Sequence, residues 1–276
     1  MKTKISAYER VKLARDSARP KITDYIDRLF TDFIELSGDR LGKEDASILG
    51  GIARFNGIPV TVVGHQKGKN LEENLKMNFG MPGPEGYRKA LRLMKQAEKF
   101  GRPVITFIDT PGAYPGMEAE ENGISVSIAE NLAQMSSLKV PIIAIVTGEG
   151  CSGGALAIGV ADRVWMLENA VYSILSPEGF ASILWKDSSR SEEACEVMKM
   201  TADELLEVDL IDKVIPEPEG GIQADLSEGC EAIRRELSME LKKLMQIPTE
   251  QLLDTRYQKF RHIEGKYHPS RIRQDK

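Results

Sequence analysis

A glycine-rich run constrains the fold of this chain more than any other feature. It covers residues 147–159, follows the apolar segment 141–146 and opens a helix of small residues. Glycines in a turn between a strand and a helix expose backbone N–H groups that no side chain shields, and the helix adds its positive dipole end. Because such donors can stabilise a developing oxyanion, the run predicts acyl- or carboxyl-transfer chemistry carried by the backbone.

Apolar runs alternate with helical patterns along most of the chain. Strands are predicted at 48–55, 58–64, 104–108, 141–146, 163–167 and 171–175. Helices are predicted between them at 85–100 and 121–138. Asn56-Gly57 between the first two strands indicates a hairpin. The continuous apolar runs favour an α/β fold with buried parallel strands. Because ligands gather at the carboxyl ends of such strands, the loops 109–116 and 147–154 are expected to meet as one floor.

The pattern divides the chain into three segments. We expect an N-terminal helical segment at 1–45, a core at 46–216 and a C-terminal helical segment at 217–276. Within the core, residues 67–84 are rich in Gly, Asn, Lys and Pro and are predicted to form a long, functional loop. Ser176 and Pro177 are typical of the cap and first position of a helix.

Composition narrows the classes of function. The net charge of -5 gives no support to nucleic-acid binding, and no apolar run approaches the ~20 residues that span a bilayer. The three cysteines are widely spaced and the three histidines form no metal-ligand pattern, so we expect no metal on this chain. Without a signal peptide or a disulfide framework, a cytoplasmic protein is predicted.

A serine hydrolase is one alternative reading of the glycine run. Residues 150–154 match the G-x-S-x-G pattern between a strand and a helix, with Ser152 as the nucleophile. The acids and histidines that would complete a triad are Asp187, Asp209, Asp212, His262 and His268. Both histidines lie in a charged tail and no His-Gly-Gly loop precedes the run, which weighs against this reading. Cys151 is better explained as a small buried residue than as a nucleophile.

Other polar residues near the predicted strand ends have both structural and functional interpretations. His65 is a candidate general base, although a histidine that satisfies a backbone group is more common. Lys67 and Lys69 are compatible with phosphate binding and equally with a place in a solvated loop. We expect Asp109 to cap the turn at residues 111–112, and Glu149 to orient the glycine turn.

Several long motifs together resemble the carboxyltransferase α subunits of bacterial acetyl-CoA carboxylase. They lie at residues 64–68, 78–90, 107–116, 148–159 and 176–185. The resemblance covers roughly residues 20–250. It implies a crotonase-like fold, in which β-β-α units form a spiral wrapped by helices. It assigns no role to residues 1–20.

The resemblance also implies an activity and partners. A carboxyl group passes from carboxybiotin, held on a biotin carboxyl carrier protein, to acetyl-CoA, and the malonyl-CoA formed serves fatty-acid synthesis. The implied site is shared with a β subunit that carries a zinc ribbon, in an α2β2 heterotetramer, with biotin carboxylase in the wider complex. A non-catalytic crotonase-like scaffold that binds an acyl-CoA or the carrier is the remaining alternative.

Carried over residue by residue, the family's oxyanion-binding pair falls on Gly153 and Gly154. We expect further contacts on the biotin side of the pocket from Gly112, Ala113, Gly150 and Ser152. The resemblance leaves open whether basic residues such as Arg88, Lys89 and Arg92 meet CoA phosphates or a subunit interface.

Overall fold

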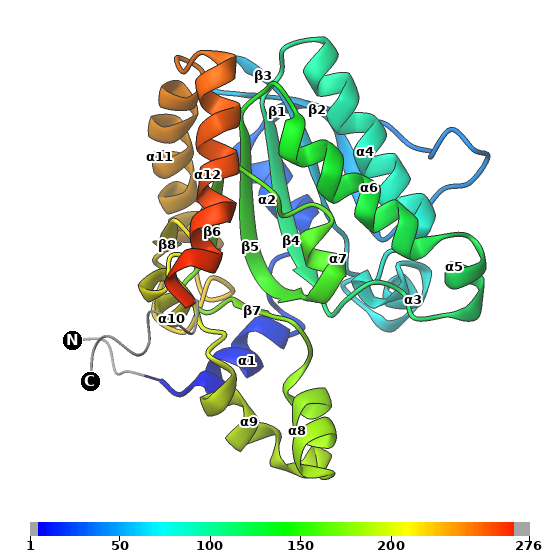
Figure 1. Ribbon diagram of the computed structural model, residues 1–276, viewed down its shortest axis with the longest axis vertical. Helices are drawn as coiled ribbons and strands as arrows, with labels where there is room; N and C mark the ends of the chain where they lie inside the picture. The colour runs from blue at the N-terminus through cyan, green and yellow to red at the C-terminus, as the bar shows by residue number, and fades with distance from the viewer. Residues whose placement is uncertain (1–4, 268–276) are drawn as a thin grey trace.

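A computed structural model describes residues 5–267 as a mixed β-sheet with helices packed around it (Figure 1). The strand order is β1-β2-β3-β4-β5-β6-β8, and β7 pairs with β5 off this path. The strands are β1 Thr31–Glu35, β2 Ile48–Phe55, β3 Ile58–His65, β4 Val104–Thr110, β5 Ile142–Cys151, β6 Arg163–Leu167, β7 Val171–Ser173 and β8 Lys213–Ile215.

Two kinds of strand pairing make up this sheet. The pairs β1–β2 and β2–β3 are antiparallel, whereas β3, β4, β5, β6 and β8 run parallel, and β5 also pairs in parallel with β7. Asn56 and Gly57 both have positive φ between the paired residues Phe55 and Ile58, which confirms the predicted hairpin. The parallel strands β4 and β5 are almost completely buried, as their apolar sequences predict.

Helices surround the sheet. Figure 1 shows α4 and α6 side by side over one part of it, α11 and α12 at another edge, and α8 with α9 as a lobe below the body. The helices are α1 Ala7–Arg15, α2 Ile22–Leu29, α3 Leu71–Lys76, α4 Pro84–Lys99, α5 Met117–Glu121, α6 Ile124–Ser137, α7 Ser152–Leu156, α8 Pro177–Trp185, α9 Ser191–Met198, α10 Ala202–Glu207, α11 Leu226–Leu244 and α12 Thr249–Tyr267.

One hydrophobic core joins the three segments of the chain. Tyr25 on α2 stacks on Phe107 of β4, with ring centroids 5.4 Å apart. Leu237 and Leu241 on α11 are buried in the same cluster as the central strands. The division at residues 45/46 and 216/217 stays a prediction, but the described parts of the segments pack together.

The structure corrects several predicted elements. Residues 31–35 are not helical but form the edge strand β1, where Phe33 and Ile34 pack against β2. The predicted loop 67–84 contains α3 and a short 3-10 helix at Asn78–Gly80. The predicted helix 121–138 begins only at Ile124, because Gly123 adopts a left-handed conformation after α5.

The glycine run itself is more extended than a turn. Residues 147–151 continue β5, and Glu149, Gly150 and Cys151 pair with β7. The change from strand to helix takes place at one residue, Ser152, whose φ is 55°. The predicted glycine turn is therefore replaced by a strand that runs directly into α7.

Candidate active site

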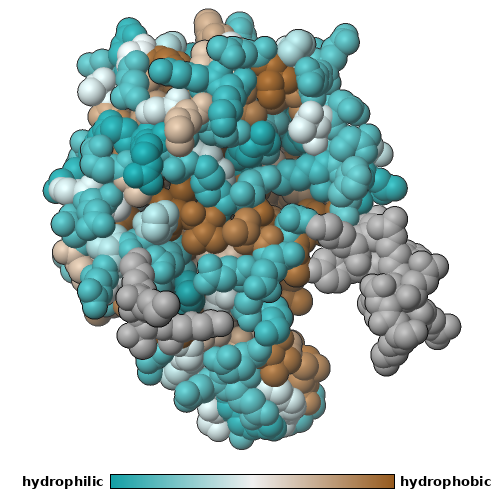
Figure 2. All heavy atoms as spheres, turned by 90° about the vertical axis from the view of Figure 1, so that its left-hand side faces the viewer, coloured by the Kyte–Doolittle hydropathy of each residue, from teal (hydrophilic) through white to brown (hydrophobic). Residues whose placement is uncertain are grey.

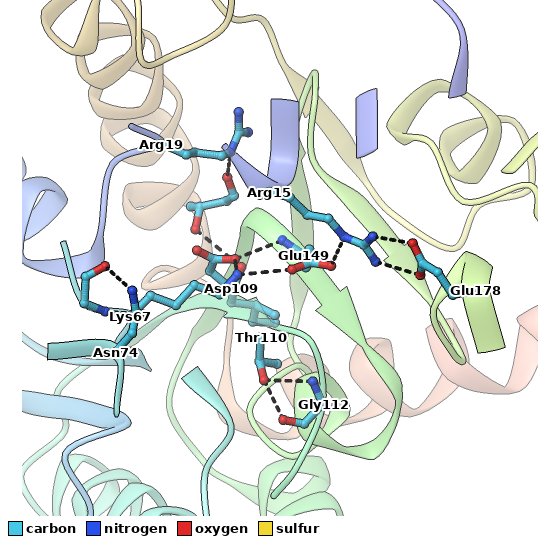
Figure 3. Close-up of polar contacts among 12 residues, drawn as sticks. Arg15, Arg19, Lys67, Asn74, Asp109, Thr110, Gly112, Glu149 and Glu178 are labelled. Atoms are coloured by element: carbon cyan, nitrogen blue, oxygen red, sulfur yellow. Dashed lines mark hydrogen bonds and ion pairs between the residues drawn. The ribbon is translucent and has the colours of Figure 1, made fainter. Parts of the chain in front are cut away.

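The ends of β4 and β5 lie side by side at the carboxyl edge of the parallel sheet. Ile108 pairs with Val146 and Thr110 with Gly150, with an irregularity in between. The segment after β4 and the start of α7 follow directly from these strands (Figure 3). The predicted meeting of the two glycine-containing segments is confirmed, because Gly112 and Ala113 contact Gly154.

Gly153 and Gly154 are the second and third residues of α7. The N-cap residue is Cys151, and its side chain makes no capping hydrogen bond. The first N–H groups of an α-helix have no partner within the helix, so both glycines present N–H donors that a ligand oxygen can accept. Because α7 has only five residues, these local donors matter more than a helix dipole.

The two glycines differ in the space around them. A Cβ atom on Gly154 would lie 2.6 Å from the backbone N of Ala113, so only glycine allows this close approach. A Cβ atom on Gly153 would meet nothing closer than Ile128, at 3.6 Å. Packing therefore explains the glycine at 154 but not the glycine at 153.

Thr110 fixes the loop that faces Gly154. Its hydroxyl donates to the carbonyl of Gly112 at 2.7 Å and accepts from the N–H of Gly112 at 3.0 Å (Figure 3). Gly112 has a φ of 144°, in the region that favours glycine. The N–H of Gly112 is thus used within the loop, and Gly112 and Ala113 form a rigid wall beside α7.

The other two predicted contact residues lie on either side of the strand-to-helix change. Gly150 is buried inside β5, where a Cβ atom would come within 2.9 Å of the Tyr172 ring. Ser152 is exposed at the start of α7. The structure thus gives Gly150 a packing role, and substrate contact by either residue stays a prediction.

A series of ion pairs connects the ends of β4 and β5 to α1, α8 and the loop after β3. Lys67 Nζ lies 2.6 Å from Asp109 and 3.3 Å from Glu149, and Arg15 bridges Glu149 to Glu178 of α8, at 2.7 Å each (Figure 3). Burial opposes both charged forms of the first pair, yet the pKa of Lys67 is raised and that of Asp109 is lowered, because their charges face each other.

The ion pairs correct the role predicted for Asp109 and show which residues Glu149 contacts. Asp109 does not cap the following turn, because its carboxylate accepts from the N–H of Glu149 at 3.0 Å. A Cβ atom at Gly148 would lie 2.3 Å from the same carboxylate, which explains the glycine there. Glu149 accepts hydrogen bonds from Arg15 and Lys67 and so fixes the side of β5 that faces them.

The N-terminal segment, for which the sequence offered no role, helps to hold these strand ends. Arg19 is 1% exposed and donates to the carbonyl of Thr147 at 2.6 Å. The same guanidinium pairs with buried Glu217 at 2.7 Å, which also accepts from Asn169. Two arginines from residues 15–19 therefore attach to the strand that leads to Gly153.

The histidines do not complete a hydrolase site. His262 lies on α12 in a pocket with Asp209 and Asp212, away from α7, and His268 lies outside the described residues. His65 is buried, and neither ring nitrogen has a hydrogen-bond partner among the described residues. Burial lowers its pKa to about 3, so the ring is neutral. Among the described histidines, none hydrogen-bonds Ser152, and the triad is not assembled.

The basic residues of α4 are engaged elsewhere. Arg88 pairs with Asp39 at 3.0 Å, Lys89 donates to the carbonyl of Asp45 at 2.8 Å, and Arg92 donates to backbone carbonyls at Leu36, Ser37 and Gly38. They hold the segment between β1 and β2 against α4. This structural role accounts for all three side chains.

Residues 5–267 contain neither a metal-binding cluster nor a membrane-spanning helix. No group of three or more His, Cys, Asp or Glu side chains in this part of the chain is arranged to hold a metal ion. None of the described helices is both long and apolar enough to cross a membrane.

Solved structures with the same fold are carboxyltransferases and related enzymes. The chain superposes on transcarboxylase 12S with a TM-score of 0.65 at 22% identity, covering 81% of this chain and 42% of that one. For the β subunit of geranyl-CoA carboxylase from P. aeruginosa, the TM-score is 0.66 at 14% identity, covering 90% and 46%. These likenesses confirm the predicted crotonase-like fold.

Sequence comparison makes the assignment specific. A family model described as acetyl co-enzyme A carboxylase carboxyltransferase-like matches residues 1–264. The chain belongs to this family, among its α subunits. The α subunit of Clostridium acetobutylicum acetyl-coenzyme A carboxylase carboxyl transferase is 59% identical over 263 residues, covering 95% of this chain and 96% of that protein. Its counterpart from Streptococcus thermophilus is 62% identical over 251 residues, covering 91% and 96%.

Proposed function

We propose that Gly153 and Gly154 form the oxyanion-binding pair of a carboxyltransferase that moves a carboxyl group from biotin to acetyl-CoA. The observation that supports this role is the pair of uncapped N–H groups at the start of α7. Hydrogen-bond donors held in place before the reaction stabilise charge without reorganising, which is the main source of catalysis in sites of this kind.

The residues present fit a biotin ureido group. Biotin carboxylated on a carrier protein would supply the carboxyl group, and negative charge would develop on its ureido oxygen as that group leaves. Gly153 and Gly154 would donate to this oxygen, and the absence of a side chain at Gly153 leaves room for it beside Ile128. The wall formed by Gly112 and Ala113, held by Thr110, would orient the ring.

A β subunit and a biotin carboxyl carrier protein are the partners we propose. The curated relatives are named as α subunits, so a second subunit is expected to complete the site. We also propose an α2β2 heterotetramer, with biotin carboxylase in the wider complex. We place the acetyl-CoA enolate and the zinc ribbon on the β subunit. The three cysteines of this chain are free and buried, which agrees with the cytoplasmic location that we propose.

The reverse reaction tests this proposal directly. Malonyl-CoA-dependent carboxylation of a biotin derivative is measured with this chain alone and then with a cognate β subunit. We expect activity only in the mixture. Gly153→Val should lower the rate ~100- to 1000-fold, because the side chain would shield an oxyanion donor. The proposal would be contradicted if that variant turned over at the wild-type rate, or if a correctly assembled wild-type mixture had no activity.

A further inference from the structure

A second, basic cavity adjoins the candidate active site. It has a volume of about 460 Å³, and Pro111 on its wall directly precedes Gly112. The cationic residues around it come from the N-terminal segment and from the loop after β3: Arg15, Lys21, Lys67 and Lys69. Figure 3 shows the Arg15 and Lys67 side of this region, where both side chains point toward Glu149.

Three of these four cations are neutralised within the protein. Lys67 pairs with Asp109 and Glu149, and Arg15 pairs with Glu149 and Glu178. Lys69 lies 2.7 Å from Asp24. The carboxylates of Asp109, Glu149 and Asp24 therefore already face other cations. Asp16, which also lines the cavity, accepts from the N–H of Ala18 and forms no ion pair with the fourth cation.

Lys21 is the cation without a partner. It is only 6% exposed, and its ammonium group makes no ion pair or hydrogen bond with any residue in the described part of the chain. Burial lowers the pKa of Lys21. The carboxylates of Asp109 and Asp24 oppose this shift in part, and the charges of Lys67 and Arg19 add to it. A buried, unpaired ammonium group is costly, so its place on a cavity wall indicates that an anion completes it.

We propose that this cavity binds a phosphate group of an organic ligand, with Lys21 as its principal cation. A phosphate carries up to two negative charges and several acceptor oxygens, and each lysine ammonium offers three donors, so Lys69 at the exposed rim can also contribute. The ring of Phe79, 43% exposed on the same wall, provides an apolar surface for the rest of the ligand.

Two sources of such a phosphate are possible, and the chemistry is the same for both. One source is the phosphorylated end of the CoA substrate, and this alternative rests on the proposed function. The other is a separate phosphorylated small molecule that binds next to the active site.

Direct binding tests the proposal without turnover. Isothermal titration calorimetry of the full chain with inorganic pyrophosphate and with adenosine 3′,5′-bisphosphate should show binding, whereas adenosine without phosphate should not bind. Lys21→Met should weaken both anions about tenfold or more, as expected when a hydrogen bond to a charged group is lost. Lys95→Met removes the same charge from an exposed position of α4 and should change affinity less than twofold.

Folding is controlled in the same experiment. Lys21→Met removes an unpaired buried charge and should not lower the thermal midpoint, and Lys69→Met changes only the exposed rim and should give a smaller loss of affinity. Absence of anion binding to the wild type, or equal binding by wild type and Lys21→Met, would overturn the proposal. Gly153→Val should keep anion binding while losing carboxyl transfer, which separates this proposal from the proposed function.

Kinetics of the assembled enzyme identify the source of the phosphate. If CoA is the ligand, Lys21→Met raises KM for malonyl-CoA and leaves kcat unchanged, with no effect on a malonyl thioester that lacks phosphates. If a separate molecule is the ligand, KM for both thioesters stays at the wild-type value while bisphosphate binding is lost.

Discussion

At the residue scale, the glycines of residues 147–159 have different reasons to be glycine. At four of the five, a Cβ atom would come within 3.0 Å of another atom: Gly148, Gly150, Gly154 and Gly159. Gly153 differs, because nothing lies closer than 3.6 Å. A glycine that packing does not require, next to an uncapped helix start, is best explained by what approaches it from outside.

Alanine at the two central glycines should separate packing from function. Gly154→Ala places a methyl group against the backbone of Gly112 and Ala113 and should cost about 1–3 kcal/mol of unfolding free energy. Gly153→Ala meets only Ile128 and should leave stability close to the wild type. Urea unfolding of both variants measures the difference. Equal destabilisation would show that the two positions are packed alike.

The buried imidazole of His65 predicts a pH dependence of stability. Its folded pKa is about 3, against about 6.5 when unfolded, so the unfolded chain binds more protons between these values. The group contributes no penalty above pH 6.5, and the free energy of unfolding falls as the pH decreases toward 3. From pH 7 to pH 5 this one group should remove about 2 kcal/mol.

His65→Phe removes that contribution. Chemical unfolding of the wild type and the variant at pH 7 and at pH 5 gives four free energies. The variant should gain about 2 kcal/mol relative to the wild type at the lower pH, whatever its stability at pH 7. Parallel pH profiles would show that His65 titrates alike in the folded and unfolded states.

At the scale of elements, periodicity predicted those that are both long and locally patterned. The helix α4 and the buried strands β4 and β5 have continuous apolar stripes or runs, and each was predicted to within a few residues. β1 and β8 were missed, because five- and three-residue strands at the sheet edges depend on pairing with a neighbour. The glycine run was read as a turn, since its extension through Cys151 depends on β7.

In the candidate site too, local features could be predicted from the sequence and contacts between distant residues could not. The backbone donors at Gly153 and Gly154 lie in one local run, so the sequence could indicate them. The pairing of Lys67 with Asp109 and the attachment of Arg15 to Glu149 join positions 42 and 134 residues apart. The only signal for them was that Lys67 and Asp109 each follow a predicted strand. The sequence contained no signal for Lys21, since its proposed role depends on the cavity around it.

A single arginine fixes the last helix to the body. Arg256 on α12 is 1% exposed, pairs with Asp162 at 2.8 Å and donates to the carbonyls of Met135, Leu138 and Val140. Arg256→Met removes the donor to these carbonyls and the cation beside the buried Asp162 carboxylate, which keeps only its hydrogen bond from the N–H of Ile142. We expect a loss of about 3–5 kcal/mol of unfolding free energy.

Thermal and urea unfolding measure this loss. Lys243→Met on α11 serves as the control, because the Lys243 side chain is 71% exposed and its ion pair with Glu240 should contribute less than about 1 kcal/mol. A variant at Arg256 as stable as the control would show that α12 is held by its apolar contacts instead.

At the scale of the whole molecule, the lobe of α8 and α9 stands apart from the compact body. It contacts α1, and Arg15 links it to β5 through Glu178. Figure 2 shows hydrophobic side chains gathered on this lower lobe. Four large apolar residues here are more than half exposed: Ile174, Ile183, Leu184 and Val197. A cluster of this kind on a protein surface marks a place where another protein surface packs.

The isolated chain should therefore self-associate through this lobe. Ile183 and Leu184 are 61% and 59% exposed, so replacing both with serine removes apolar surface without opening a cavity, and stability should change by less than about 1 kcal/mol. In sedimentation velocity over a concentration series, the wild type should form larger species and the double variant should stay monomeric. Met239→Ser on α11, 46% exposed, removes an apolar side chain elsewhere and should behave as the wild type. A wild type that is monomeric throughout, or a double variant that associates equally, would mean that the lobe does not drive association.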